Sequence, residues 1–342
     1  MRIGGLTPGR NPCWAVPSGR TPHFGGFIMN MVHLHLLVNH FPIIGTILGL
    51  GLYLVSLIGK SDDLKRASLD VFFVIALIAI PAYQTGSAAK AAIKGRPGIS
   101  ETLIVAHEDA ALLAFIFMEL TGALAWLGLW QYRRILRQTT WNVSAVLLLS
   151  IVTVGLMART GNLGGEISHP EIRSAAEATE GAAGFRIPWI TSTAVAGYVK
   201  EIPWIWPTSE ALHFIGLSLL FGILLSVNLR MLGMAKALSF VDLHRLLPWG
   251  LLGFGLNLIT GMLFFIGTPG QYTGNVAFFW KMAFLMLAGI NVLYLTVFDE
   301  AWSLGPEDNA PVRAKVIAVF AIFLWVGVIY FGRMLPFLGN SF

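Results

Sequence analysis

The sequence predicts an all-α, polytopic integral membrane protein with eight transmembrane helices arranged as two four-helix bundles. Hydrophobic residues make up 56% of the 342 residues and charged residues only 12%, about half the charged fraction of a typical soluble domain. The mean hydropathy is +0.71. Apolar runs of roughly 20 residues, the length that crosses a bilayer as a helix, recur along the chain.

These apolar runs define the expected spans. They are 37–59, 69–88, 105–130, 142–160, 209–232, 247–267, 276–298 and 314–335. We therefore expect four parts in the chain. They are a tail at 1–28, a four-helix membrane bundle at 29–160, an extracytoplasmic loop at 161–207 and a second four-helix membrane bundle at 208–342.

The tail at 1–28 is rich in Gly, Pro and Arg and lacks helical periodicity. It has no continuous apolar stretch before a cleavage site, so it does not resemble a signal peptide. We expect it to be disordered or to result from the choice of start codon, with Met29 or Met31 as alternative starts.

Basic residues indicate the orientation. Lys and Arg gather in the odd-numbered loops, for example at Arg133 and Arg134, although Lys90 and Lys94 lie in an even-numbered loop. Cytoplasmic loops carry the excess of Lys and Arg. We therefore expect a multi-pass protein of the bacterial inner (cytoplasmic) membrane with both termini outside. The net charge of +5 calls for no nucleic-acid partner.

Cys13 is the single cysteine of the chain. One cysteine excludes an internal disulfide, a thiolate metal cluster and covalent c-type haem attachment, which needs a CxxCH motif.

Histidines near the outer ends of the first and third spans are the candidate ligands. His33 and His40 are seven residues apart, so on a continuous helix they share a face and His35 points elsewhere. Pro42 fits the first turn of a helix beginning near His40. His107 is expected at a similar depth. His40 and His107 are therefore candidate iron ligands of haem b, since two histidines on separate helices of a bundle suffice.

Packing is the alternative explanation for these histidines. A histidine at a helix end often bonds to a loop carbonyl, and the same rings with carboxylates could also hold a metal ion. His33 and His35 are expected at the membrane interface. Glu119 lies about 18 Å along the helix axis from His107, near mid-bilayer. Its carboxyl is expected to be protonated, paired with a polar neighbour or part of a proton path.

A second polar group follows the fourth span. Arg159 is expected to end that span, and the glycines Gly161 and Gly164 to permit close backbone approach in the loop beyond it. Arg159, His169 and Arg173 could bind haem propionates, a quinone head group or lipid phosphate. Arg159 could instead snorkel to the interface.

The second half offers Glu210 and His213, three residues apart on one side of the fifth helix. Lys281 stands four to six residues inside the seventh span. A lysine there either snorkels or pairs with an acid, and Glu210 is the expected partner. Glu210, His213 and Lys281 are therefore candidates for a second cofactor-binding site.

The first half resembles an uncharacterised bacterial family of four-helix membrane domains, the domain of unknown function 2231 type. The stretches that carry the resemblance are HLLVNHFPIIGTILGLGL, PAYQTGSAAK, RPGISETLIVAHEDAA and ARTGNLGGEISHPEIR. The resemblance implies a four-helix fold over about residues 30–175, with His40, His107, Glu108 and Gly164 through Arg173 as its recurrent polar features. Relatives joined to Rieske-type or cytochrome c-type modules imply electron transfer. Many members carry an acidic residue where this chain has Ser87.

The second half resembles another uncharacterised four-helix membrane family, and weakly the copper-resistance and cytochrome b561-like bundles. The stretches EALHFIGLSLLFGILLSVNLRMLG, LLPWGLLGFGLNLITG and WKMAFLMLAGIN carry this resemblance. An aspartate is common in that family at the position of Asn228, so any role of that carboxylate does not transfer to this chain.

Three functional hypotheses follow. The leading one is a b-type cytochrome or quinone-linked electron-transfer subunit, with its cofactor near the outer face and a quinone and a redox partner protein as partners. The second is a transporter of a metal or small solute that uses the same polar residues. The third is a non-catalytic membrane anchor or scaffold subunit of a larger complex.

Overall fold

The computed structural model describes residues 31–169, 187–297, 302, 304–305 and 308–338, and all the regular elements in these ranges are helices. Eight helical segments are long and apolar enough to cross a membrane. The all-α fold with eight membrane spans is therefore confirmed. The predicted tail at 1–28 lies outside the described residues.

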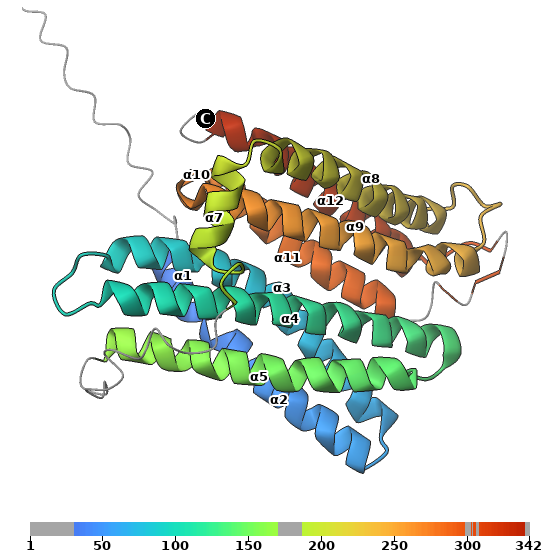
Figure 1. Ribbon diagram of the computed structural model, residues 1–342. Coiled ribbons are helices and arrows are strands. Elements are labelled where there is room, and N and C mark those ends of the chain that lie inside the picture. Colours follow the sequence, from blue (N-terminus) through green and yellow to red (C-terminus); the bar gives the residue numbers. More distant parts are fainter. Residues whose placement is uncertain (1–30, 170–186, 298–301, 303, 306–307, 339–342) are drawn as a thin grey trace, which may run out of the picture. The chain divides into compact units, whose positions relative to one another are not determined.

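Eleven helices make up the described chain (Figure 1). They are α1 (Met31–Val38), α2 (His40–Ile58), α3 (Asp62–Ile93), α4 (Glu101–Ile135), α5 (Thr140–Ser168), α7 (Ser192–Glu201), α8 (Ile205–Met231), α9 (Phe240–Gly267), α10 (Pro269–Thr273), α11 (Val276–Val297) and α12 (Val312–Leu338).

Side-chain caps fix where several of these helices begin. The hydroxyl oxygens of Ser61, Ser100 and Thr191 accept from the backbone N–H three residues further on, at the starts of α3, α4 and α7. Each cap satisfies one of the N–H groups that a helix start leaves without a partner. Asp62 and Asp63 add negative charge to the first turn of α3, where the helix dipole favours it.

The first span is interrupted at Asn39, between α1 and α2. Pro42 has no N–H, so the carbonyl of Val38 loses its helical donor at this point. Pro42 lies in the first turn of α2, as predicted. Asn39 itself keeps helical backbone angles, φ −63° and ψ −26°, and its N–H donates to the carbonyl of His35 at 2.9 Å.

Helix α5 extends to Ser168 and therefore beyond the predicted end of the fourth span at 160. The glycines expected in a loop are part of this helix. A Cβ at Gly161 would lie 3.1 Å from Ile43 Cδ1, and one at Gly164 would lie 3.3 Å from His107 Cε1. Close packing against α2 and α4 therefore explains these glycines. The connection expected at 161–207 is shorter and contains α7, and its residues 170–186 lie outside the described ranges.

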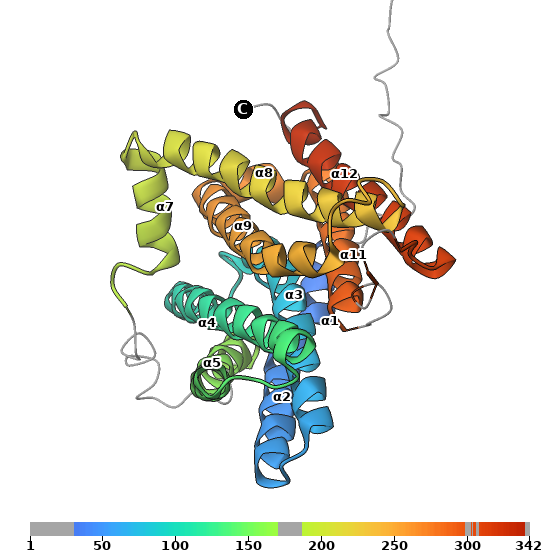
Figure 2. The ribbon, with the colours of Figure 1, turned by 90° about the vertical axis from the view of Figure 1, so that its right-hand side faces the viewer.

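The long helices run back and forth, so their connections alternate between two ends (Figures 1 and 2). One end carries α7 and α10, and we call it the α7 end. Helices α1–α5 form the first half and α8–α12 the second, and both belong to one compact unit, Met31–Phe342. Met262 and Phe265 of α9 pack in the same hydrophobic cluster as residues of α2–α5.

Polar contacts also join the halves at the end opposite α7. Trp126 Nε1 donates to Thr296 Oγ1 at 2.9 Å, and Arg133 Nε donates to the carbonyl of the same Thr296 at 2.9 Å. Trp130 Nε1 donates to the carbonyl of His244 at 3.0 Å. These bonds connect α4 to α11 and α9, so the first half (α1–α5) and the second half (α8–α12) form one folded body.

Within the second half, α8 and α9 approach most closely at two glycines. A Cβ built on Gly216 would lie 2.8 Å from the carbonyl oxygen of Gly253, and one on Gly253 would lie 2.8 Å from the backbone nitrogen of Leu220. Small residues at such crossings let membrane helices pack backbone against backbone.

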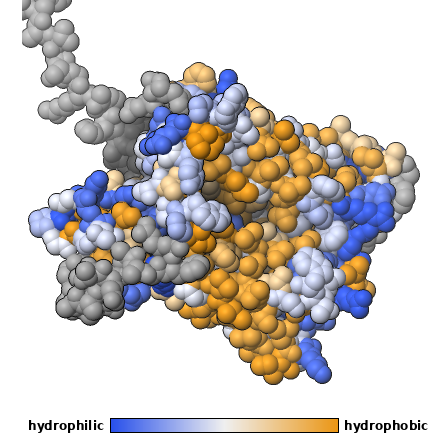
Figure 3. All heavy atoms as spheres, viewed as in Figure 1, coloured by the Kyte–Doolittle hydropathy of each residue, from blue (hydrophilic) through white to orange (hydrophobic). Residues whose placement is uncertain are grey.

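The surface agrees with a membrane location. In Figure 3 hydrophobic side chains cover the middle of the visible face, and hydrophilic ones gather towards the ends of the helices. Large apolar side chains such as Leu148 and Phe323 are more than half exposed. Such surface is stable in contact with lipid, so contact of these helices with a bilayer follows.

Candidate functional site

His35 of α1 lies against α3 at the α7 end of the first half. Its Nδ1 is 3.1 Å from the carbonyl oxygen of Ala82 and 3.1 Å from Thr85 Oγ1. A carbonyl oxygen can only accept, and the Thr85 hydroxyl already donates to Pro81. The proton of the neutral ring is therefore on Nδ1, and Nε2 carries a lone pair.

His107 of α4 is held in the same way against α5. Its Nδ1 lies 3.0 Å from the carbonyl oxygen of Thr160, so this ring too carries its proton on Nδ1. Gly164 of α5 and Gly86 of α3 lie against the edges of the two rings. A Cβ at Gly86 would be 3.4 Å from His35 Cε1, so a larger side chain at either glycine would crowd an imidazole.

The structure brings three of the histidines together. His35 is close enough to His107 and His40 for its charged form to interact electrostatically with both. His40 is exposed and lines an apolar groove between α2 and α3 with residues such as Phe41 and Val74. His35, expected only at the interface, is thus the partly buried neighbour of His107. The partners of the His35 ring, Ala82 and Thr85, belong to another helix, so no local sequence pattern indicated this contact.

A polar layer surrounds this group at the α7 end. Lys90 Nζ lies 2.5 Å from Glu108 Oε2. Asp109 Oδ1 accepts from the backbone N–H of Ser192 at 3.0 Å and so attaches α7 to α4. Tyr83 OH lies 3.4 Å from Ser192 Oγ. The pairing of Lys90 with Glu108 neutralises one of the basic residues that departed from the loop-charge pattern.

Arg159, His169 and Arg173 were the expected anion-binding group. Arg159 lies inside α5, and His169 caps the end of that helix through a 2.8 Å bond from its backbone N–H to the carbonyl of Gly165. Arg173 lies outside the described residues. Glu166, two residues before the end of α5, is buried and accepts from Asn162 Nδ2.

His213 of α8 is the polar residue around which the second candidate site is built. Its Nδ1 lies 2.7 Å from Thr260 Oγ1, whose proton is donated to the carbonyl of Leu256. This ring therefore also leaves Nε2 as an acceptor. Lys281 of α11 is close enough to interact electrostatically with His213, and its Nζ lies 3.7 Å from the Cβ position of Gly332.

The expected ion pair between Lys281 and Glu210 is wrong. The salt bridges found among the described residues do not include this pair, and Glu210 is exposed. Glu210 lies near the start of α8, where water can solvate its carboxylate, so it gains little by bonding to a lysine inside the bundle. The structure therefore brings Lys281 to His213 rather than to an acid.

Metal sites with several protein ligands are not formed by the described part of the chain. No group of three or more His, Cys, Asp or Glu side chains in those ranges is arranged to hold an ion. A centre with only two protein ligands, which is the case of bis-histidine haem, is a separate arrangement.

Apart from Met31, helices α1–α5 lie within the stretch of the chain that matches a known family model. Residues 32–170 match the family model of a predicted membrane protein, DUF2231. The resemblance predicted from the sequence is thus confirmed for this region. The DUF2231 region holds His35, His40 and His107, whereas His213 and Lys281 lie beyond it.

The match covers less than half of the chain, and the resemblance predicted for the second half stays a prediction. No curated protein and no solved structure matches the sequence. The function of the protein must therefore be inferred from its own residues.

Proposed function

We propose that the chain is a membrane-embedded electron-transfer subunit whose DUF2231 region binds a b-type haem between His35 and His107. One observation supports this proposal above the others. His35 of α1 and His107 of α4 are neighbours, and each ring donates from Nδ1 to a main-chain carbonyl. The Nε2 atom of each ring therefore keeps a free lone pair. Metal-bound histidines usually have this arrangement, because the Nδ1 bond fixes the tautomer and the ring orientation.

The donor set suits haem iron better than a simple metal site. Axial ligation needs two histidines from separate helices of a bundle, and this region supplies two. A transported ion such as Zn²⁺ would need three or four ligands, and the described residues do not group that many. His35 replaces His40 in the proposed pair, because His40 is exposed at the groove between α2 and α3.

A difference spectrum tests the proposal directly. The full chain, purified after expression with haem supplementation, should give the reduced α band of a bis-histidine haem. The substitutions His35→Ala and His107→Ala should abolish that band, and the matched controls His33→Ala and His40→Ala should retain it.

Two results would overturn this assignment. If His40→Ala abolishes the band and His35→Ala retains it, His40 is the second ligand and the pair with His35 is wrong. If the wild-type protein is colourless, the electron-transfer proposal fails, and the transporter and scaffold hypotheses remain for these histidines.

The orientation is part of the same proposal. Both termini and the α7 end face outwards from a bacterial inner membrane, so the haem would lie near the outer face, where quinone in the bilayer and a redox partner protein could exchange electrons with it. The last turn of α4 contains Arg133 and Arg134 on the opposite, cytoplasmic side. Reporter fusions at Arg134 and Lys200 of α7 should show opposite sidedness, and the same sidedness would contradict the arrangement.

A further inference from the structure

A cavity of about 410 Å³ lies between the two halves of the protein. Helices α3 and α4 line one side of the cavity, and α8, α9, α11 and α12 line the other. Val195 of α7 and Ile190, just before α7, also line it. Its volume falls within the range of about 300–1,000 Å³ that is usual for small-molecule sites. The cavity shares no residue with the His35 and His107 pair, so it is an independent feature.

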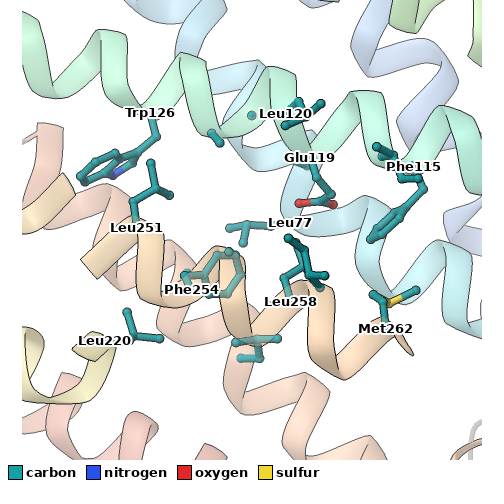
Figure 4. A pocket seen from close by; sticks show the side chains of 18 of the residues that line it. Leu77, Phe115, Glu119, Leu120, Trp126, Leu220, Leu251, Phe254, Leu258 and Met262 are labelled. Carbon is teal, nitrogen blue, oxygen red and sulfur yellow. The ribbon is translucent and has the colours of Figure 1, made fainter. Parts of the chain in front are cut away.

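Glu119 is the one ionisable residue among the described residues that line this cavity. Figure 4 shows its carboxyl group leaving α4 and pointing towards Leu77 of α3 and Leu258 of α9. Its Oε1 is buried and has no hydrogen-bond partner. A buried carboxyl without a partner loses its hydration with no compensation, and natural proteins seldom keep such a group without a function.

Depth and lining decide which ligand chemistry fits. Glu119 is about 27 Å along the axis from the start of α4 at Glu101, so it lies deep in the span. The rest of the lining is aliphatic or aromatic and offers no cation to a charged ligand. An anionic head group would therefore be buried without a counter-charge, and a cationic one would require Glu119 to be ionised deep in the span, which costs free energy.

We propose that this cavity binds an uncharged isoprenoid-type molecule that enters from the bilayer, and that Glu119, as a neutral carboxylic acid, hydrogen bonds to its single carbonyl or hydroxyl group. The apolar body of the ligand contacts residues such as Phe254 and Leu258, and the carboxyl selects for the oxygen. A quinone and an isoprenoid alcohol share this chemistry. A lipid acyl chain would fill the same volume without satisfying Glu119.

Binding can be measured on the full chain in detergent through quenching of tryptophan fluorescence by decylubiquinone, since Trp126 lines the cavity. Farnesol and farnesene, which differ by one hydroxyl group, serve as competitors. We expect farnesol to displace decylubiquinone at lower concentration than farnesene. If farnesol displaces decylubiquinone, the site accepts an isoprenoid alcohol. If decylubiquinone quenches saturably but farnesol does not displace it, the site is specific for quinones.

Variants of Glu119 test the hydrogen bond. Glu119→Leu should weaken binding of the oxygen-bearing probes about three- to tenfold, the range of one lost hydrogen bond, and should leave farnesene competition unchanged or stronger. Glu119→Gln, which keeps a donor and an acceptor, should retain most of the affinity. Glu101→Gln, at the exposed start of the same helix, is the matched control and should have no effect.

A glycine pair tests the location. A Cβ at Gly255, which lines the cavity, and one at Gly222, which does not, would each meet nothing within 4 Å. Gly255→Phe should abolish saturable quenching, and Gly222→Phe should preserve it. The proposal is overturned if Glu119→Leu and Gly255→Phe bind decylubiquinone like the wild type. It is also overturned if farnesol and farnesene both displace decylubiquinone and do so at the same concentration. That result would show that the cavity binds apolar chains without using the oxygen.

Discussion

The glycine crossing of α8 and α9 allows a prediction with a definite sign. Gly216→Ala and Gly253→Ala should each destabilise the protein, whereas the same change at Gly222 on α8 or Gly255 on α9 should not. The added methyl group at Gly216 would lie 2.8 Å from the Gly253 carbonyl oxygen, and the methyl at Gly253 would lie 2.8 Å from two backbone atoms of α8.

The magnitude follows from the distance by which the helices must separate. Ordinary contact begins at 3.4 Å, so the backbones must move apart by about 0.6 Å (3.4 − 2.8). The neighbouring atom is main chain, so no side-chain rotation can provide this space. Overpacking of this kind costs about 1–3 kcal/mol. Alanine at Gly222 or Gly255 meets open space, and its better helix propensity should stabilise by up to about 1 kcal/mol.

Unfolding in sodium dodecyl sulfate, followed by circular dichroism in mixed micelles, measures these differences. The two crossing variants should unfold at lower detergent fraction than the wild type, and the two controls at equal or higher fraction. If all four alanine variants shift in the same direction by similar amounts, helix propensity alone accounts for the data and the packing argument is refuted.

Three further changes should have measurable effects. Arg230 is fully buried, donates to the carbonyls of Leu238, Asp308 and Gly305, and lies 4.3 Å over the Phe240 ring. Arg230→Met should therefore lower the free energy of unfolding by about 2–4 kcal/mol, and an unchanged unfolding curve would contradict this. Lys90→Met and Glu108→Gln should each cost about 1 kcal/mol, with a double variant no less stable than one single variant; additive losses would show that the two side chains are not coupled. Asp109→Leu removes the acceptor of the Ser192 N–H, so hydrogen exchange should rise in α7 and stay unchanged in α12, and uniform protection would refute that attachment.

The membrane spans were predictable because the bilayer restricts which backbone conformations can cross it. Backbone groups inside hydrocarbon must bond within their own segment, so a long apolar run is compatible with little besides a helix. The run at 142–160 therefore predicted a helix correctly, but not its length. Gly161 and Gly164 suggested a loop by local propensity, whereas the structure uses them for close packing of α5 against Ile43 and His107.

The candidate site was less predictable because it depends on contacts between helices. His35 gave no local signal for its bond to Ala82, which is 47 residues away in sequence. Arg230 stands at the end of an apolar run, where basic residues are usually solvated, yet it is fully buried. Lys281 was assigned to Glu210 on charge alone, which ignored the water available to Glu210. In each case the deciding quantity is tertiary burial.

The position of Glu119 has a consequence for biogenesis. Helix α4 leaves the ribosome before α9, so its mid-span carboxyl enters the bilayer before the wall that contains Leu258 and Met262 exists. An ionisable side chain at the centre of an inserting helix is costly to place in lipid, and the leucines and phenylalanines of α4 offset this cost. Until α9 is inserted, the carboxyl of Glu119 lacks the part of its surroundings that Leu258 and Met262 supply in the folded protein.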